Sequence, residues 1–307
     1  MTFRTGHIDD HPEVVKRRLG IHLHPEIGAM RAGALPLKST NRAKLIKNGG
    51  PGILNQNDTG SCEGHAHASG LTLKLALAGT PLTEVISPVG LYLGALMVDR
   101  GAVPTSGKLP PLTDSGTMPS SIQTASQTWG STGASVWGQY PASSGTMYVT
   151  PSDPNSALIE PTPEKLYAES AYRLKGMYFV QSTGLQKVID ILTVLAAGNP
   201  VSDAIPASGQ DFQGYAGGVL SYPSGAVDHA NLVVDYEWTG TQEQFTQWLA
   251  GAPSLDQYLI GYGVNSWGTS WGEADAMSGA TGGTYQFNRS FFDGLQDAAV
   301  LDVVKAS

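Results

Sequence analysis

The sequence predicts an α+β fold of two lobes, a helical lobe followed by a lobe rich in strands. Helix-length segments with recognisable ends dominate the first half of the chain, whereas short β-prone runs separated by glycine-rich turns follow Asn199-Pro200. No segment repeats along the chain. This order of helices and then strands is typical of an α+β architecture. We expect an N-terminal extension over residues 1–35, a mainly helical lobe over 36–180 and a mainly β lobe over 181–307.

Four segments carry the signals of helices, at residues 62–79, 87–101, 118–130 and 184–198. The first has Gly79 at its end and Pro81 just beyond, which is a usual C-terminal signature. In the second, Ser87 is placed to cap the helix and Pro88 takes the first helical position. The fourth has apolar residues at the spacing of a buried stripe.

Four β-prone runs follow, at residues 200–207, 229–238, 257–268 and 283–289. Residues 239–257 read as an insertion between two of these strands. Residues 131–163 are rich in Ser, Gly, Pro and Thr and predict a long surface connection. A short basic helical piece is predicted at residues 12–20.

Composition excludes several classes of protein. The chain carries 26 acidic and 18 basic side chains, a net charge of −8, which argues against binding nucleic acid through its phosphates. The first twenty residues carry charge throughout and lack the apolar stretch of a secretory signal, so we expect synthesis in the cytosol. No apolar run is long enough to cross a membrane, and we expect no membrane span.

The one cysteine, Cys62, follows Gly-Ser at a predicted helix start. A single cysteine excludes an intramolecular disulfide and a zinc site built on thiolate pairs. A helix N-terminus and a nearby imidazolium both lower the pKa of a thiol, so this position favours a nucleophile if a histidine meets it. His65 and His67 lie along the same helix and are interpreted as packing or surface residues. They lack a third ligand at a sensible spacing, so we expect no metal site.

His229 is the better candidate partner, because it begins a β-prone run in the other lobe and can face the helix end across an interface. Asn265 can accept the imidazole Nδ1–H and fix the ring's orientation and tautomer. Trp267, two residues further on, can keep water away from that hydrogen bond.

Four separated stretches together resemble the papain-like cysteine peptidases: Gln56, "GSC" at 60–62, "VDHA" at 227–230 and "NSWGTSWGE" at 265–273. The resemblance covers roughly residues 35–290. It implies a helical left lobe and a β-barrel-like right lobe with the active site in the cleft between them. It also implies roles for individual residues: Cys62 as nucleophile, His229 as its ion-pair partner and general acid, Asn265 as the residue that orients His229, Trp267 as the cover of that contact, and Gln56 as a donor of the oxyanion hole.

The resemblance assigns substrate contacts to two further residues. Ala230 matches a position that lines the pocket for the second residue before the scissile bond. Gly116 is a weaker match to the glycine-rich edge that pairs with substrate backbone. Glu63 departs from the family pattern, which has tryptophan there. An ionised carboxylate at this position opposes thiol activation, and we expect it to point away into solvent, since the next helix position faces about 100° round the axis.

We therefore expect a cysteine endopeptidase that acts on peptide or protein substrates through a Cys62 thioester, with no cofactor. About 35 residues precede the catalytic unit, fewer than in the family's inhibitory propeptides, so we expect control by means other than zymogen processing. Two alternatives remain open. One is a structural protein with the same fold, incorporated in a bacteriophage particle or similar assembly. The other is an amidase that cleaves cell-wall peptide on the same machinery.

Overall fold

The structure, a computed structural model, describes residues 7–9, 11, 14, 18–20, 35–47, 49–56, 59–99, 101, 114–130, 132–137 and 172–305. Its helices are α3 (Cys62–Leu77), α4 (Pro88–Asp99), α5 (Pro119–Thr128), α8 (Gly184–Ala196), α9 (Gln210–Gln213), α10 (Gln242–Leu249) and α11 (Arg289–Gly294). Short 3₁₀ helices span Asn41–Lys44, Ala134–Trp137 and Pro253–Tyr258.

The four predicted helices are confirmed as α3, α4, α5 and α8, within two residues at most ends. Their caps follow the sequence signals. Ser87 Oγ accepts a hydrogen bond from the backbone N–H of Gly90 at 3.0 Å, which caps α4. Gly79 follows α3 with a φ of +77°, and Gly198 follows α8 with a φ of +79°. Such left-handed positions favour glycine, and this explains why the helices end there.

The strands are β1 (Leu19–Gly20), β2 (Tyr172–Phe179), β3 (Val201–Ile205), β4 (Val219–Leu220), β5 (His229–Trp238), β6 (Leu259–Val264), β7 (Glu273–Asp275), β8 (Ala280–Phe287) and β9 (Gln296–Lys305). Within the described parts of the chain they form one sheet in the order β1-β2-β9-β3-β5-β6-β8-β4, with β7 paired to β8. The two ends of this path do not pair, so the expected β-barrel-like right lobe is an open sheet that includes β2 from the predicted helical lobe.

The four predicted strands are confirmed as β3, β5, β6 and β8, whereas β2 and β9 were not predicted. These two strands pair with each other, so each depends on a partner more than 100 residues away. The predicted insertion at 239–257 folds into α10 and a 3₁₀ helix. Of the helical piece expected at 12–20, most lies outside the described residues, and Leu19–Gly20 forms β1 instead. Most of the connection at 131–163 also lies outside them.

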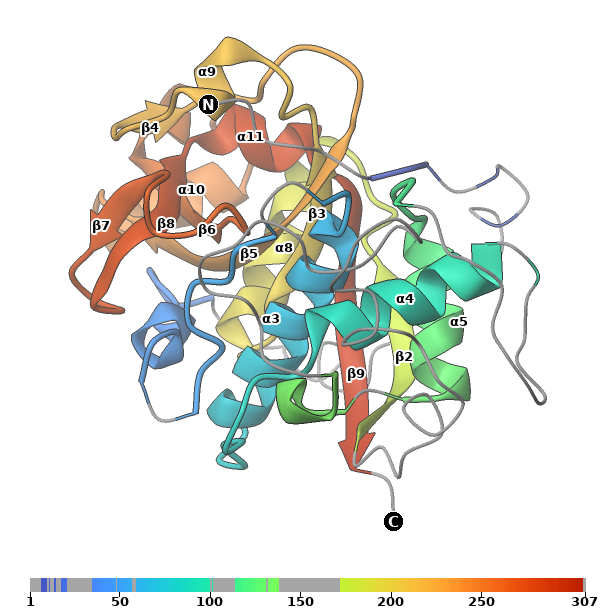
Figure 1. Ribbon diagram of the computed structural model, residues 1–307. Coiled ribbons are helices and arrows are strands. Elements are labelled where there is room, and N and C mark those ends of the chain that lie inside the picture. The colour runs from blue at the N-terminus through green and yellow to red at the C-terminus, as the bar shows by residue number, and fades with distance from the viewer. Residues whose placement is uncertain are drawn as a thin grey trace, which may run out of the picture.

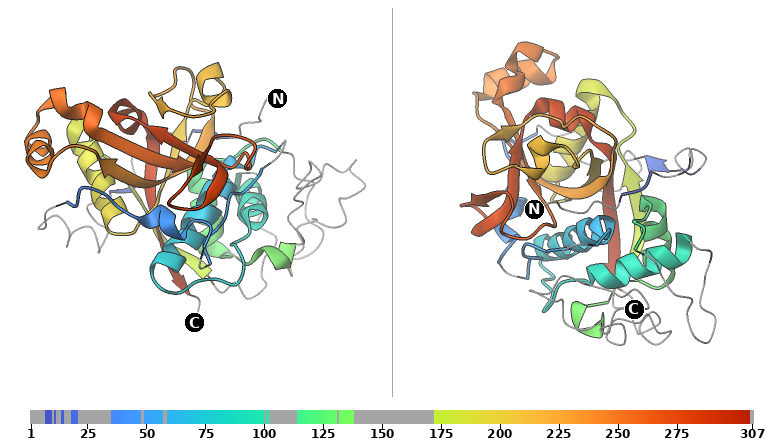
Figure 2. Two further views of the ribbon diagram at one scale, coloured as in Figure 1. Left: turned by 90° about the vertical axis from the view of Figure 1, so that its left-hand side faces the viewer. Right: turned by 45° about the horizontal axis from the view of Figure 1, so that its top comes forward.

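Helix α3 runs through the middle of the molecule, with α4 packed on one side and strands β5 and β3 on the other, while α5 packs on α4 and on β2 (Figure 1). The two further views in Figure 2 show the same separation, with β6 and β8 on the far side of α3 from α4 and α5. Every residue of α3 except Lys74 and Leu77 is buried. A helix buried on all faces needs small residues where its neighbours approach, and Gly64 lies where an added Cβ would come within 2.6 Å of the Pro88 carbonyl oxygen. Within the described segments, no helix is both long and apolar enough to span a membrane.

A buried carboxylate holds the segment before α3 against the sheet. Asp235 of β5 accepts hydrogen bonds from Ser39 Oγ at 2.5 Å and from the backbone N–H groups of Asn41 and Arg42 at 2.8 and 3.0 Å. The Asp235 side chain is fully buried, so each of these bonds replaces a contact with water.

We expect Asp235→Asn to lower the free energy of unfolding by about 2–3 kcal/mol, because the new amide NH₂ faces a backbone N–H and leaves a buried donor unpaired. Denaturant unfolding measures the change. Glu237→Gln is the matched control on the same strand. It removes a half-buried carboxylate that lies 3.9 Å from Arg42, so its cost is expected to stay below about 1 kcal/mol. Equal effects of the two substitutions would contradict the assignment of Asp235 as the anchor.

Candidate active site

The candidate nucleophile, Cys62, is the first residue of α3, as predicted. Its side chain is fully buried and forms a contact cluster with Ala66, one turn further along the helix, and with Ala230 of β5. Ala230 directly follows His229 in the chain. The structure therefore places Cys62, at the start of α3, in contact with Ala230, the chain neighbour of His229 on β5.

His229 is held by the two residues that the sequence paired with it. Its ring nitrogen Nε2 lies 2.7 Å from Oδ1 of Asn265, and the indole of Trp267 packs on the ring with centroids 4.7 Å apart. The sequence-based expectation that Asn265 takes the Nδ1–H was wrong, because the ring presents Nε2 to the amide. In the described part of the chain Nδ1 is buried without a hydrogen-bond partner, so the structure shows no hydrogen bond from it to the Cys62 sulfur.

Gln56 is fully buried and lies beside Ser266, the residue that follows Asn265. Its Nε2 donates to the carbonyl oxygen of Thr59 at 2.7 Å, and its Oε1 accepts from Ser266 Oγ at 2.5 Å. The Thr59 N–H donates to the Gln56 carbonyl oxygen at 3.2 Å. Sequence reasoning missed Ser266, which the Asn-Ser-Trp stretch contains between two chosen residues.

Burial controls the charge of the histidines in this structure. It lowers the pKa of His229 to about 4, and this outweighs the Asn265 hydrogen bond and the charges of Asp228 and Glu63, which act to raise it. Burial also lowers the pKa of His65 to about 4, although its Nδ1 lies 2.8 Å from the Ser61 carbonyl oxygen. Both imidazoles are therefore neutral at pH 7.

Glu63 does not point into solvent, and that expectation was wrong. Its side chain is only 3% exposed, and Oε1 lies 2.6 Å from Nδ1 of His7. The Glu63 carboxylate can be buried because the imidazole of His7 supplies it with a hydrogen-bond donor and a positive charge. His7 belongs to the N-terminal extension and lies 56 residues earlier in the chain. Nothing in the local sequence around Glu63 signals this partner.

Residues 7 and 8 bridge the two sides of the site. The His7 backbone N–H donates to the carbonyl oxygen of Asp228 at 3.0 Å, and the Ile8 N–H donates to the carbonyl oxygen of Thr117 at 3.1 Å. His7 and Thr117 also form a parallel β-bridge. Thr117 follows Gly116, which the sequence analysis matched to the edge that pairs with substrate. The N-terminal segment thus lies between the neighbours of Cys62 and of His229.

A close approach of two glycines shapes this edge. Gly116 has a φ of +79°, and an added Cβ on Gly60 would come within 3.0 Å of the Gly116 nitrogen. A side chain at position 60 would therefore separate the loop before Cys62 from the Gly116 edge.

One group of side chains could geometrically hold a metal ion among the described residues: His7, Asp9 and Asp297. Burial acts to lower the pKa of His7, but the hydrogen bond and charge of Glu63, with smaller contributions from Asp297 and Asp9, raise it to about 9. The protonated imidazole pairs with the carboxylates around it, so these side chains form an ion-pair cluster at neutral pH.

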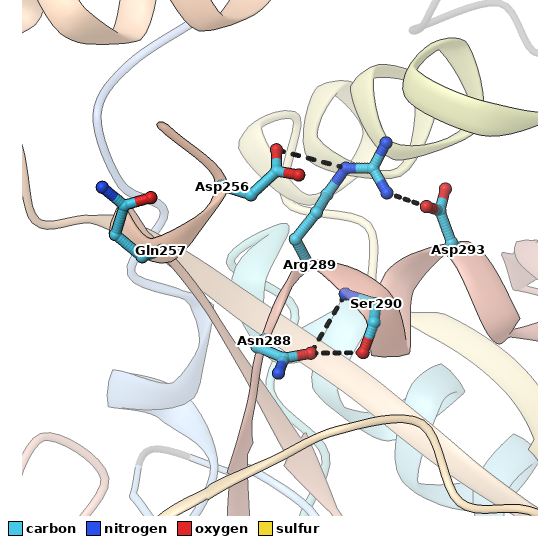
Figure 3. A pocket seen from close by; sticks show the side chains of 6 residues that line it. All are labelled: Asp256, Gln257, Asn288, Arg289, Ser290 and Asp293. Atoms are coloured by element: carbon cyan, nitrogen blue, oxygen red, sulfur yellow. Dashed lines mark hydrogen bonds and ion pairs between the residues drawn. The ribbon is translucent and has the colours of Figure 1, made fainter. Parts of the chain in front are cut away.

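A surface pocket of about 290 Å³ lies elsewhere and contains none of the candidate residues. Figure 3 shows it: Arg289 reaches toward Asp256 and Asp293, while Asn288 accepts hydrogen bonds from Ser290. The charges in this pocket pair with one another.

In a comparison with known protein families, residues 125–285 match the papain family cysteine proteases. The matched stretch contains His229 and Asn265 but begins after Gln56 and Cys62. The assignment of the cysteine therefore depends on the contacts described above.

Individual relatives match over shorter stretches. Papain from Carica papaya is 35% identical over 106 residues, which are 33% of this chain and 25% of that protein. Cathepsin L from Sarcophaga peregrina is 40% identical over 82 residues, 26% of this chain and 20% of that protein. Among solved structures, xylellain, a cysteine protease from Xylella fastidiosa, is similar in fold with a TM-score of 0.62 at 17% identity, covering 99% of this chain and 98% of xylellain.

The buried histidines predict acid lability. A histidine whose folded pKa is about 4 and whose unfolded pKa is about 6.5 binds more protons when unfolded, so stability is full above pH 6.5 and falls as pH drops toward 4. We expect His65→Gln to flatten this fall by roughly 3 kcal/mol. Unfolding free energies measured from pH 7 to pH 4 test it, with the exposed His11→Gln as control. A variant curve parallel to wild type would contradict the burial argument.

Proposed function

Because this chain belongs to the papain family of cysteine proteases, we propose that it is a cysteine endopeptidase whose nucleophile is the sulfur of Cys62. One observation carries the proposal. The His229–Asn265 hydrogen bond of 2.7 Å lies beside Ala230, the residue that packs on Cys62 at the start of α3. A cysteine at a helix N-terminus beside an oriented imidazole has the two features that lower a thiol pKa.

In the proposed reaction, Nδ1 of His229 accepts the proton of the Cys62 thiol. This assigns a task to the nitrogen that Asn265 leaves without a hydrogen bond. The sulfur then attacks the carbonyl carbon of the substrate. The tetrahedral intermediate collapses when the C–N bond breaks and the imidazolium gives its proton to the leaving amine. A water molecule, deprotonated by His229, finally hydrolyses the thioester.

Asn265 and Trp267 keep the imidazole productive. The Asn265 carbonyl oxygen accepts the Nε2–H without adding a charge, which fixes the tautomer with Nδ1 as the base. The packed indole of Trp267 covers the ring and limits access of water to that bond. The neutral state of His229 in this structure corresponds to a resting pair in which the thiol keeps its proton.

Gln56 is proposed to stabilise the oxyanion together with the Cys62 backbone N–H. A side-chain amide carries two N–H groups, and the bond to the Thr59 carbonyl engages one of them. Ser266 and Thr59 hold the amide at both ends, so the donor is oriented before the substrate arrives. Such preorganised donors each contribute about 2.7–4 kcal/mol of transition-state stabilisation.

The pairing of Cys62 with His229 predicts fast alkylation at low pH. In His7→Ala, where the bridging segment is weakened and a charge that lowers the His229 pKa is removed, iodoacetamide should modify Cys62 readily at pH 6. Adding His229→Ala should slow this roughly 100-fold, because an ordinary thiol is almost fully protonated there. Mass spectrometry locates the label unambiguously in a chain with one cysteine. Equal, slow rates in all variants, with no cleavage of any peptide, would favour a structural role for the fold.

The role of Gln56 can be separated from thiol activation. Gln56→Ala should reduce peptide hydrolysis about 10²- to 10³-fold, as the loss of one oxyanion donor does elsewhere. Alkylation by iodoacetamide passes through no oxyanion, so its rate should stay within a few-fold of wild type. Gln186→Ala, on α8, is the matched control. A parallel loss of hydrolysis and alkylation would show that Gln56 supports the fold or the thiolate instead.

A further inference from the structure

The N-terminal segment places the His7 side chain against the carboxylates of Glu63 and Asp297, which together form an acidic niche next to Cys62. The His7 side chain is fully buried, with Nδ1 at 2.6 Å from Glu63 and Nε2 at 3.7 Å from Asp297. Glu63 follows Cys62 directly, and Asp297 lies on β9 with a φ of +51°. Asp9, on the same segment as His7, adds a third carboxylate at 3.1 Å from Nε2, but it is largely exposed.

Both carboxylates of the niche depend on the N-terminal extension for their counter-charges. His7 pairs with Glu63, and Arg18 forms an ion pair with Asp297 while stacking over Phe179. The other histidine beside Glu63 does not neutralise it. His67 Nδ1 lies 2.8 Å from the Glu63 backbone carbonyl, and burial lowers the His67 pKa.

The niche is therefore incomplete without a cation. Glu63 is 3% exposed and Asp297 is 15% exposed, so leaving them without partners would cost free energy. The same attraction raises the pKa of His7, because the two carboxylates favour its protonated form. Asp297 also borders a surface cavity of about 380 Å³ that Arg18 and Phe179 line, which gives the niche a side facing solvent.

The backbone of the segment is held as an extended peptide would be. His7 and Ile8 donate to Asp228 and Thr117, the residues that flank the two sides of the site. A peptide that docks there by backbone hydrogen bonds obtains affinity from the main chain, and side-chain selectivity comes from the niche.

We propose that Glu63 and Asp297 form a specificity pocket for a basic side chain, which His7 fills in this structure and which an arginine or lysine of a substrate fills during cleavage. This inference rests on the proposed peptidase function. Substrates with a basic residue at the matching position displace residues 7–9, and neutral or acidic peptides compete poorly because they leave the Glu63 carboxylate without the cation that His7 supplied.

The test uses fluorogenic peptides that are scanned one position at a time on either side of the cleaved bond. Arginine is compared with citrulline, an uncharged side chain of almost the same shape. For the full chain we expect the arginine peptide to have a kcat/KM roughly 10- to 100-fold higher at one position, as a buried charge-assisted hydrogen bond would give. His7→Ala should raise the rate on all peptides and keep the preference.

Two variants locate the preference. Glu63→Gln and Asp297→Asn should each reduce the arginine-to-citrulline ratio toward about one, with continued hydrolysis of the citrulline peptide as evidence that the site is intact. Glu243→Gln, an exposed carboxylate on α10, should leave the ratio as in wild type. Cleavage without any preference for arginine, or a preference that both niche variants retain, overturns the pocket and leaves the peptidase proposal standing. If no peptide is cleaved and Cys62 resists alkylation, both proposals fail.

Discussion

The packing of α3 against β5 is the contact on which the rest of the structure depends. Cys62 and Ala66 meet Ala230 at one end of this interface, and Gly70 meets the Leu232 side chain further along, where an added Cβ would come within 3.1 Å. Small residues on the helix let the two elements approach closely. Because Cys62 and His229 are separated by 167 positions in the sequence, tertiary packing such as this interface sets their relative position.

The site is also organised by where its charges are placed. The central group of Cys62, His229 and Asn265 contains no fixed charge, and burial keeps His229 neutral in this structure. The ionic groups lie beside it, with Glu63 and Asp297 held by His7 and Arg18. An arrangement of this kind links the protonation of the catalytic pair to whatever occupies the niche, because removing the His7 cation removes a charge that lowers the His229 pKa.

Much of the site could be predicted from the sequence, because its signals are local. The Gly-Ser pair before Cys62 marked the start of α3, and Gly79 and Pro81 marked its end. The Asn-Ser-Trp stretch identified the partner of His229. The capping box of Thr241 with Gln244 was also readable and would have revealed α10 inside the presumed insertion.

What could not be predicted depends on contacts between distant residues. Strands β2 and β9 form because they pair with each other, and neither has a strong alternating pattern of its own. The burial of Glu63 requires His7, and the choice of Nε2 for Asn265 is set by how the imidazole enters the interface. The periodicity of a helix contains no information about the N-terminal extension. A prediction from periodicity alone therefore placed the Glu63 side chain toward solvent.

The most direct test of the central claim, that folding brings His229 to Cys62 as an ion-pair partner, is the thiolate titration of Cys62. The ultraviolet absorbance of a thiolate can be followed against pH in His7→Ala and in the double variant His7→Ala/His229→Ala, and the single cysteine makes the signal unambiguous. If the ion pair forms, Cys62 becomes a thiolate well below the ordinary thiol pKa of about 8.5 in the first protein and titrates as an ordinary thiol in the second. Titration near 8.5 in both proteins would contradict it.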